Sequence, residues 1–408
     1  MPKPRFELAD VFRQHGPSYR QSHRLSPQQH RVMRAIEQCR TARLGGHRDQ
    51  CDRCGHTRVS YNSCRNRHCP KCQSLAKAEW LDQQRAQLLP IHYFHVVFTL
   101  PDSLAQLALQ NKRVVYNILF RAASETLRRI AQDPKHLGAQ IGFLAVLHTW
   151  GQTLLHHPHL HCVVPGGGLS ADGRRWIACR PNFFLPVKVL SRLFRGLFLH
   201  YLEQAFVQNK LEFYGTLEQL SDQHTFRDFL HTLRQLQWVV YAKRPFGGPA
   251  QVLDYLGRYT HRVAISNHRL LSLDGGKITF SWRDYRRANQ LREITLDADE
   301  FIRRFLLHVL PEGFVRIRHY GLLSNCRREL RLSTCRQLMG VAGPTPQSER
   351  RDWKARYQTL TGEAIDLCPA CHQARLLRVE VFPPARPSRS SLGRRRFKPG
   401  FTIGVDSS

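Results

Sequence analysis

The sequence predicts an α+β fold, and three observations lead to that class. Short β-branched and aromatic runs, such as residues 92–100, alternate with apolar stretches at helical spacing, such as residues 101–130. Two Cys-x-x-Cys pairs lie close together near the N-terminus, which is typical of a small zinc ribbon. Hydrophobic residues make up 42% of the 408 positions, enough for a folded core, and a basic, mixed region begins after about residue 297.

Local signals place the individual elements. Residues 1–46 are predicted to be helical, with Ser26 as an N-cap and Pro27 at the first helical position. A helix over residues 74–89 ends at Pro90. The later elements are expected, in chain order, as a buried strand at 92–100, a helix at 101–130, strands at 141–150 and 158–164, helices within 187–236, a short strand at 237–242, a helix at about 250–260, and a hairpin at 268–282 with Asp274-Gly275-Gly276 as its turn.

These elements divide the chain into four regions. Residues 1–85 form a helical and zinc-ribbon domain, and residues 86–296 form the largest domain. Residues 297–385 form a basic C-terminal region with one further cysteine pair. Residues 386–408 are rich in Pro, Ser and Arg, so we expect a disordered tail that makes non-specific phosphate contacts.

The net charge indicates the kind of partner. Lys and Arg number 62 against 31 acidic residues, which gives +31. A charge of this size opposes compaction unless a polyanion offsets it, and nucleic acid is the common polyanion. A ribosomal or membrane-surface protein is the alternative, but the basic residues are spread along the whole chain and not gathered in one amphipathic helix. No segment has the length and apolarity of a membrane span or a signal peptide, so we expect a cytoplasmic protein without a membrane partner.

The N-terminal cysteines predict a zinc site. Twelve cysteines in a chain without a secretory signal favour metal over disulfides. Cys51 and Cys54 form one Cys-x-x-Cys pair, and Cys69 and Cys72 form a second. Each pair turns two thiolates toward one point, so the four are expected to hold one structural Zn²⁺ in a tetrahedral Cys₄ site.

Other residues of the same segment are candidates for metal binding or for DNA contact. Cys64 and His68 can replace a cysteine ligand, or build a second site with His47 or His56. The simpler interpretation is that Cys64 packs and that His68 meets backbone or phosphate. Four arginines are expected to present charge to DNA, namely Arg53, Arg58, Arg65 and Arg67.

The segment His159-Leu160-His161 predicts a second, different metal site. On a strand, residues i and i+2 point to the same face, so His159 and His161 can share one metal while Leu160 faces the core. A metal with few protein ligands keeps positions open for a phosphate oxygen and water, which suits catalysis. His148, Gln152 and His157 all remain candidates for a third ligand.

Two tyrosines further along the chain are candidate nucleophiles. Tyr255 and Tyr259 are four residues apart on a predicted helix, so both rings emerge on one face. Two core aromatics on an amphipathic helix are the ordinary alternative. The neighbouring Arg258 and Arg262 are suited to phosphate, and a tyrosine hydroxyl can form a covalent phosphodiester and be displaced again.

In their order along the chain, these motifs resemble those of HUH endonucleases. The three motifs are the strand end Phe98-Thr99-Leu100-Pro101, the strand His159-Leu160-His161, and the helix with Tyr255 and Tyr259. Together with the segment SCRNRHCPKCQ, they resemble the insertion-sequence-ninety-one family of rolling-circle transposases over roughly residues 30–340. The resemblance implies that residues 86–296 are the nuclease domain, with a central antiparallel sheet and flanking helices.

The resemblance also implies an activity. A divalent magnesium or manganese ion at His159 and His161 would act in nicking and joining single-stranded DNA, through a 5′-phosphotyrosine at Tyr255, Tyr259 or both. The expected partners are single-stranded DNA at the ends of a bacterial insertion sequence and target DNA, and the expected location is the nucleoid. The oligomeric state stays open. A plasmid replication initiator or relaxase would share this chemistry, and a non-catalytic zinc-dependent DNA-binding protein is the alternative from another class.

A last cysteine pair lies in the C-terminal region. Cys368 and Cys371, followed by His372, form another knuckle that supplies two or three ligands. Cys326 and Cys335 are the candidates to complete a second zinc site with them. The alternative is a knuckle that packs without metal.

Overall fold

The computed structural model describes residues 4–85, 87–246, 251–252, 257, 263–284, 287–341, 353–362 and 364–385. The helices of eight or more residues are α1 Leu8–Ser22, α2 Pro27–Gln38, α3 Gln73–Arg85, α5 Lys112–Gln132, α6 Val187–Val207, α7 Gln223–Gln235, α9 Ala298–Leu307, α10 Arg328–Leu338 and α11 Trp353–Thr361, and α4 is the shorter Ala105–Gln110. The strands are β1 Gly46–Cys51, β2 Thr57–Tyr61, β3 Tyr93–Thr99, β4 Gly142–Trp150, β5 His156–Pro165, β6 Gly167–Leu169, β7 Trp176–Ala178, β8 Val240–Phe246, β9 Leu270–Asp274, β10 Lys277–Asp284, β11 Gln290–Asp297, β12 Ile317–Gly321 and β13 Leu376–Phe382.

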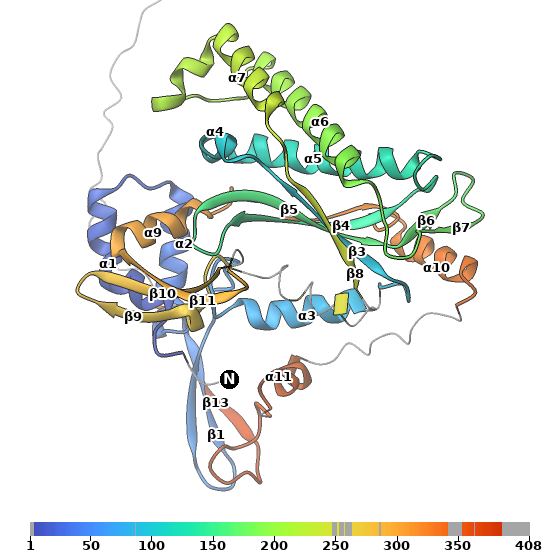
Figure 1. The fold of residues 1–408 in the computed structure, drawn as a ribbon. Helices are drawn as coiled ribbons and strands as arrows, with labels where there is room; N and C mark the ends of the chain where they lie inside the picture. The colour runs from blue at the N-terminus through green and yellow to red at the C-terminus, as the bar shows by residue number, and fades with distance from the viewer. Residues whose placement is uncertain are drawn as a thin grey trace, which may run out of the picture.

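A five-stranded sheet forms the centre of the molecule (Figure 1). Its strand order is β12-β4-β5-β3-β8, and every neighbouring pair is antiparallel. The predicted α+β fold with a central antiparallel sheet and flanking helices is therefore confirmed. In the observed register Thr99 of β3 and His148 of β4 both lie opposite His159 of β5. Because opposed residues in such a sheet point to the same face, this pairing gathers side chains from three strands.

The two faces of the central sheet have different chemistry. Leu160 and Phe98 belong to the main apolar core, where the Phe98 ring lies 4.9 Å from that of Phe194 on α6. Helices α4, α5 and α6 cover this face (Figure 1). The opposite face carries His159 and His161, and its apolar part packs with α3 and with the buried Val252. Alternation along β5 thus separates a core face from a functional face.

A second core joins the N-terminal helices to a three-stranded sheet. Helices α1 and α2 pack with α9 and with the sheet β11-β10-β9, and the rings of Phe12 and Phe305 meet edge to face at 5.4 Å. The predicted N-cap of α2 is confirmed, since the Ser26 hydroxyl accepts a hydrogen bond from the amide of Gln29 at 3.2 Å. The predicted hairpin is also confirmed as β9 and β10, and β11 extends it by a strand.

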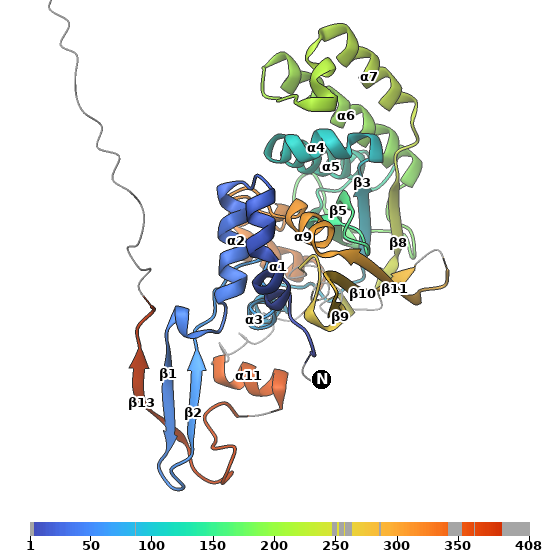
Figure 2. The ribbon, with the colours of Figure 1, turned by 90° about the vertical axis from the view of Figure 1, so that its left-hand side faces the viewer.

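A narrow three-stranded sheet, here called the projecting module, extends away from both cores (Figure 2). Its order is β13-β1-β2, so strand 376–382 pairs with strand 46–51 across most of the chain. Strand β12, from the same C-terminal part of the sequence, is an edge of the central sheet. The division of the chain at residues 85 and 296 stays a prediction, and strand pairing crosses both limits.

The long predicted helices are interrupted. The helix expected over 101–130 breaks at Asn111, whose side-chain amide donates to the carbonyl oxygens of Leu107 and Glu212. The helical stretch 187–236 contains a 3₁₀ turn at Gly215–Ser221. The predicted helix at 250–260 lies outside the described residues except at 251, 252 and 257, which are helical, and the tail 386–408 lies outside them entirely.

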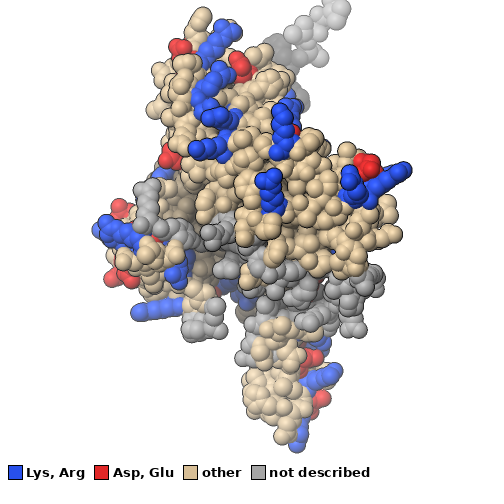
Figure 3. Space-filling view, turned by 45° about the vertical axis from the view of Figure 1, so that its right-hand side comes forward, with Lys and Arg blue, Asp and Glu red and all other residues tan. Residues whose placement is uncertain are grey.

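The described helices include none long and apolar enough to cross a bilayer. Lys and Arg side chains are spread over the face in Figure 3, from the helical layer at the top to the projecting module at the bottom. This distribution agrees with the spread of charge along the sequence.

Candidate metal centres

Three histidines meet on the functional face of the central sheet. His148 comes from β4, and His159 and His161 come from β5. One ring nitrogen of each lies within 4.8 Å of the others, a separation that a single metal ion can bridge. His148 and His161 are buried, and His159 is half-buried. Of the three candidates for a third ligand, the structure brings His148 to the pair.

Neighbouring groups fix the orientation of these rings. The Nδ1 of His159 lies 2.7 Å from the carbonyl oxygen of His157, which it can reach only as an N–H donor. The Nδ1 of His161 lies 2.9 Å from Nε2 of the buried His95 on β3. In both rings Nε2 is therefore the nitrogen left for a metal, the pattern of metal-binding histidines in proteins. Trp150 stacks on His148 with ring centroids 4.8 Å apart and completes the wall of the site.

The segment around the predicted nucleophiles lies against this same face where it is described. Val252 is buried among apolar residues of the functional face. A Cβ atom at Gly257 would lie 2.9 Å from Leu81 Cδ1 and 2.9 Å from Lys77 Cε on α3. The predicted site residues Tyr255, Tyr259, Arg258 and Arg262 lie outside the described residues.

Basic groups are buried near the end of α9 and the start of β5. Burial lowers the pKa of Lys112 to about 8, and its ammonium donates to the carbonyl oxygens of Leu307 and Val309. Burial also lowers the pKa of His156 and His308 to about 3, so both imidazoles are neutral. His308 bonds to the carbonyl of Leu154, in the loop that joins the two metal-site strands.

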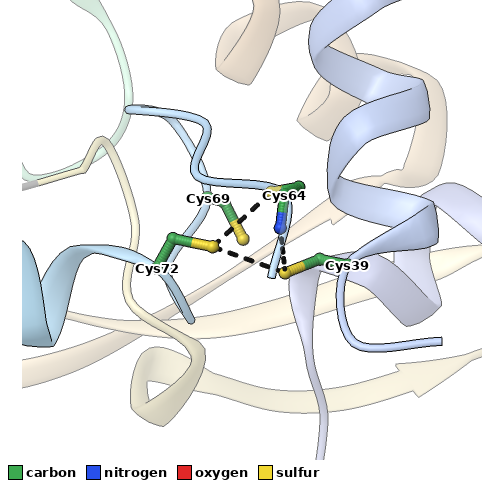
Figure 4. Close-up of side chains that lie close together, drawn as sticks. All are labelled: Cys39, Cys64, Cys69 and Cys72. Carbon is green, nitrogen blue, oxygen red and sulfur yellow. Dashed lines mark hydrogen bonds between the residues drawn. The ribbon is translucent and has the colours of Figure 1, made fainter. Parts of the chain in front are cut away.

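Eight cysteines form two separate clusters. The first contains Cys39, Cys64, Cys69 and Cys72, whose sulfurs point toward one centre (Figure 4). The Sγ of Cys72 lies 3.4 Å from that of Cys39 and 3.6 Å from that of Cys64. A tetrahedron of sulfurs with Zn–S bonds of about 2.3 Å has S···S edges of roughly 3.8 Å, so the cluster has nearly the dimensions of a zinc site.

The second cluster combines the two ends of the chain. It contains Cys51 and Cys54, at the tip of the β1–β2 hairpin, with Cys368 and Cys371. Sulfur pairs across the cluster lie 3.8 Å apart for Cys51 and Cys371 and 3.6 Å apart for Cys54 and Cys368.

The prediction of one site from Cys51, Cys54, Cys69 and Cys72 is therefore wrong. The reason is the length of the hairpin between the two pairs. Strand β1 takes five steps from Gly46 to Cys51, so the tip lies roughly 17 Å from the hairpin base at about 3.4 Å per residue. Cys69 and Cys72 follow the base, where Gly45 bonds to Asn62, and cannot share an ion with the tip.

Several secondary expectations of the N-terminal segment also change. Cys64 belongs to a cluster rather than to simple packing, and Cys39, at the C-cap of α2, was missed because it belongs to no Cys-x-x-Cys pair. His68 is buried, so it does not meet phosphate. The two arginines of this loop that were predicted to contact DNA have different surroundings. Arg67 donates hydrogen bonds to the carbonyl oxygens of Phe314 and Pro311, whereas the side chain of Arg65 is exposed. Arg67 thus ties the loop to the chain before β12, and Arg65 stays a predicted DNA contact.

The remaining cysteine candidates do not join a metal cluster among the described residues. Cys335 is buried in a small apolar core under α10, and Cys326 is exposed. They therefore do not complete a zinc site with Cys368 and Cys371, although the sequence suggested that they could. His47 pairs with Asp49 at 3.4 Å in the projecting module.

Comparison with known proteins defines the class of this chain. A model described as "Putative transposase" matches residues 142–330, and one described as "Transposase zinc-binding domain" matches residues 11–100. The first match contains β4 and β5 with the histidine site, and the second contains the first cysteine cluster. The chain is therefore a transposase with a zinc-binding domain.

Full-length relatives narrow the class to a family. A putative transposase y4qJ of Sinorhizobium fredii is 60% identical over 379 residues, covering 92% of this chain and 95% of the relative. The transposase for insertion sequence element IS801 of Pseudomonas savastanoi pv. phaseolicola is 30% identical, covering 76% of this chain and 74% of the relative. The chain belongs to the insertion-sequence-ninety-one family of rolling-circle transposases, so it binds zinc and acts on DNA.

Among solved structures, the conjugative relaxase TrwC in complex with oriT DNA shows a weak likeness. It has 14% sequence identity and a TM-score of 0.22, covering 41% of this chain and 71% of that chain.

Proposed function

We propose that this transposase nicks and rejoins single-stranded DNA at its element ends, with Tyr255, Tyr259 or both as nucleophiles and a divalent ion at the histidine site. The convergence of His148, His159 and His161 is the observation that carries the proposal. Three imidazoles on one sheet face leave the opposite side of a bound ion open to substrate, whereas a structural site is closed by four ligands.

The chemistry of the donor set supports a catalytic ion. His159 and His161 each have Nδ1 engaged by a neighbour, so neutral Nε2 donors are preoriented. Magnesium prefers oxygen ligands, so manganese is the better match of the two ions expected from the sequence. A divalent ion bound there would polarise the scissile phosphate and offset its charge.

The proposed chemistry is a transesterification without net consumption of water. The tyrosine oxygen forms a bond to phosphorus, and the bond from phosphorus to the 3′ oxygen breaks. The phenolic proton passes to solvent and the leaving 3′ oxygen takes up one proton, so the products are a 5′-phosphotyrosine and a DNA strand with a free 3′-hydroxyl. Attack by a 3′-hydroxyl on the phosphotyrosine reverses the step and joins strands. Val252 and Gly257, which flank Tyr255 and lie against this part of the molecule, support tyrosine access to the site.

Covalent adduct formation tests this proposal. Purified protein is incubated with a labelled single-stranded element-end oligonucleotide and Mn²⁺, and adducts are separated on a denaturing gel. We expect an adduct that needs the ion, that is lost in Tyr255→Phe/Tyr259→Phe and in His159→Ala/His161→Ala, and that does not form with duplex DNA. His157→Ala is the matched control, because its half-exposed imidazole lies 3.5 Å from Asp102 and outside the histidine cluster.

Two results would contradict the proposal. An adduct that persists in the double tyrosine variant would exclude tyrosine as the nucleophile. A folded, zinc-loaded protein that forms no adduct on any strand of either element end would exclude this chemistry.

A further inference from the structure

The four cysteines of the second cluster come from segments more than 300 positions apart in the sequence. Cys51 is the last residue of β1 and Cys54 follows it, whereas Cys368 and Cys371 precede β13. All four are free, and the two measured sulfur separations, 3.6 and 3.8 Å, exceed the roughly 2.05 Å of a disulfide bond. They match the roughly 3.8 Å edge of a tetrahedral Zn–S₄ site.

The local backbone at both pairs has the form of a zinc knuckle. The amide of Cys54 lies 3.5 Å from the Cys51 sulfur, which is a backbone N–H donated to sulfur. The turn that follows has the same form at both pairs: the amide of Gly55 donates to the Cys51 carbonyl oxygen at 3.2 Å, and the amide of His372 donates to that of Cys368 at 3.0 Å. The N–H bond to the Cys51 sulfur stabilises the thiolate, the form that binds metal.

Strand pairing independently holds the two segments together. Strand β13 pairs antiparallel with β1 along its length, with Leu376 opposite Cys51. The buried Asp49 lies at the centre of the sheet, 3.6 Å from Arg58 of β2 and 3.7 Å from Arg378 of β13. One carboxylate thus meets a cation from each flanking strand, so the position of β13 does not depend on the cysteines alone.

We propose that Cys51, Cys54, Cys368 and Cys371 bind a second structural Zn²⁺ that clasps the C-terminal segment to the N-terminal module. The first cluster supplies its own four sulfurs, so the protein holds two zinc ions per chain. Binding releases the thiol protons and involves no change of oxidation state. The second ion ties the start of β13 to the tip of the β1–β2 hairpin, where Leu376 lies opposite Cys51.

Zinc content of the purified full-length protein tests the clasp directly. We expect about two zinc ions per chain by elemental analysis, and about one in Cys368→Ser/Cys371→Ser. Cys326→Ser is the matched control and should keep two, since Cys326 is exposed and outside both clusters. One zinc per wild-type chain, or two in the double variant, would overturn the proposal.

Alkylation of the wild-type protein gives a second test that needs no variant. Cys54 is exposed and Cys371 is partly exposed, so without metal both should react readily with a maleimide. We expect peptide mapping to show all four cysteines of the clasp protected in the zinc-loaded protein and labelled together after chelation, with Cys326 labelled in both states. Equal labelling of Cys368 and Cys371 with and without chelator would refute the clasp. Neither test uses nuclease activity, so the clasp and the nuclease proposal can fail separately.

Discussion

His95 provides the sharpest test of how the histidine site is built. Its Nε2 lies 2.9 Å from Nδ1 of His161, and both rings are buried on the functional face of the central sheet. The rings are nearly parallel, with an interplanar angle of 10°. His95 is not among the three clustered histidines, so its expected role is to position His161 and fix its tautomer.

The size of the effect follows from that one hydrogen bond. Its loss in His95→Ala leaves the His161 ring less constrained and costs about 1–2 kcal/mol in a buried site. With about 1.4 kcal/mol for each factor of ten, the dissociation constant for Mn²⁺ should rise roughly 5- to 30-fold. His95→Gln places an amide oxygen near the position of Nε2 and should recover most of the affinity, because that oxygen accepts from Nδ1–H of His161.

Electron paramagnetic resonance of free Mn²⁺ measures this affinity without DNA or turnover. Adduct formation titrated with Mn²⁺ should show the same shift, with the maximal rate largely restored at saturating ion. Wild-type affinity in a folded His95→Ala variant would refute the positioning role. So would a failure of His95→Gln to improve on alanine when both variants have equal thermal stability, since a purely structural role would not distinguish an acceptor from a methyl group.

Three further outcomes follow from the structure. Phe98→Ala should lower the free energy of unfolding by about 3–5 kcal/mol in urea titrations, because the ring is fully buried, whereas the exposed Phe183→Ala should change it little. Burial lowers the pKa of His156 and His308 to about 3, whereas an unfolded histidine has a pKa of about 6.5. The folded state should therefore lose stability as the pH falls below 6.5, by about 2 kcal/mol for each histidine at pH 5, and this loss should be smaller in His308→Gln. Binding to a single-stranded oligonucleotide should weaken steeply with salt, with a log–log slope near −0.7 per phosphate contacted, and a slope near zero would contradict electrostatic binding.

The elements of the fold were predictable where the signal is local. The N-cap at Ser26 and the turn at Asp274-Gly275-Gly276 depend on a few neighbouring residues, and both occur as predicted. The shared face of His159 and His161 follows from the period of a strand. The position of His148 beside this pair depends instead on the register between β4 and β5. That register cannot be predicted from a short segment when both strands are buried.

The cysteine clusters show the same limit more strongly. Spacing predicted two zinc knuckles near the N-terminus, and the two pairs do occur in metal-like clusters. The cysteines that complete each cluster could not be predicted from spacing. Cys39 is a single cysteine at a helix end, and the pair Cys368 and Cys371 is brought to the hairpin tip by the pairing of β13 with β1. The length of the β1–β2 hairpin would have excluded a shared site, because the hairpin separates the cysteines at its tip from those at its base by more than one metal site can span.

The positions of the two clusters imply different structural roles for the two zinc ions. Cys69 belongs to the same apolar core as Trp150 at the end of β4 and Leu154 in the loop between β4 and β5. Trp150 in turn stacks on His148. A zinc ion in the first cluster would therefore stabilise the core that supports the histidine site, whereas the clasp lies at the far end of the projecting module, away from that core (Figure 2). The first ion thus belongs with the core that supports the histidine site, although its ligands precede β4 and β5 in the sequence, and the second belongs with the projecting module.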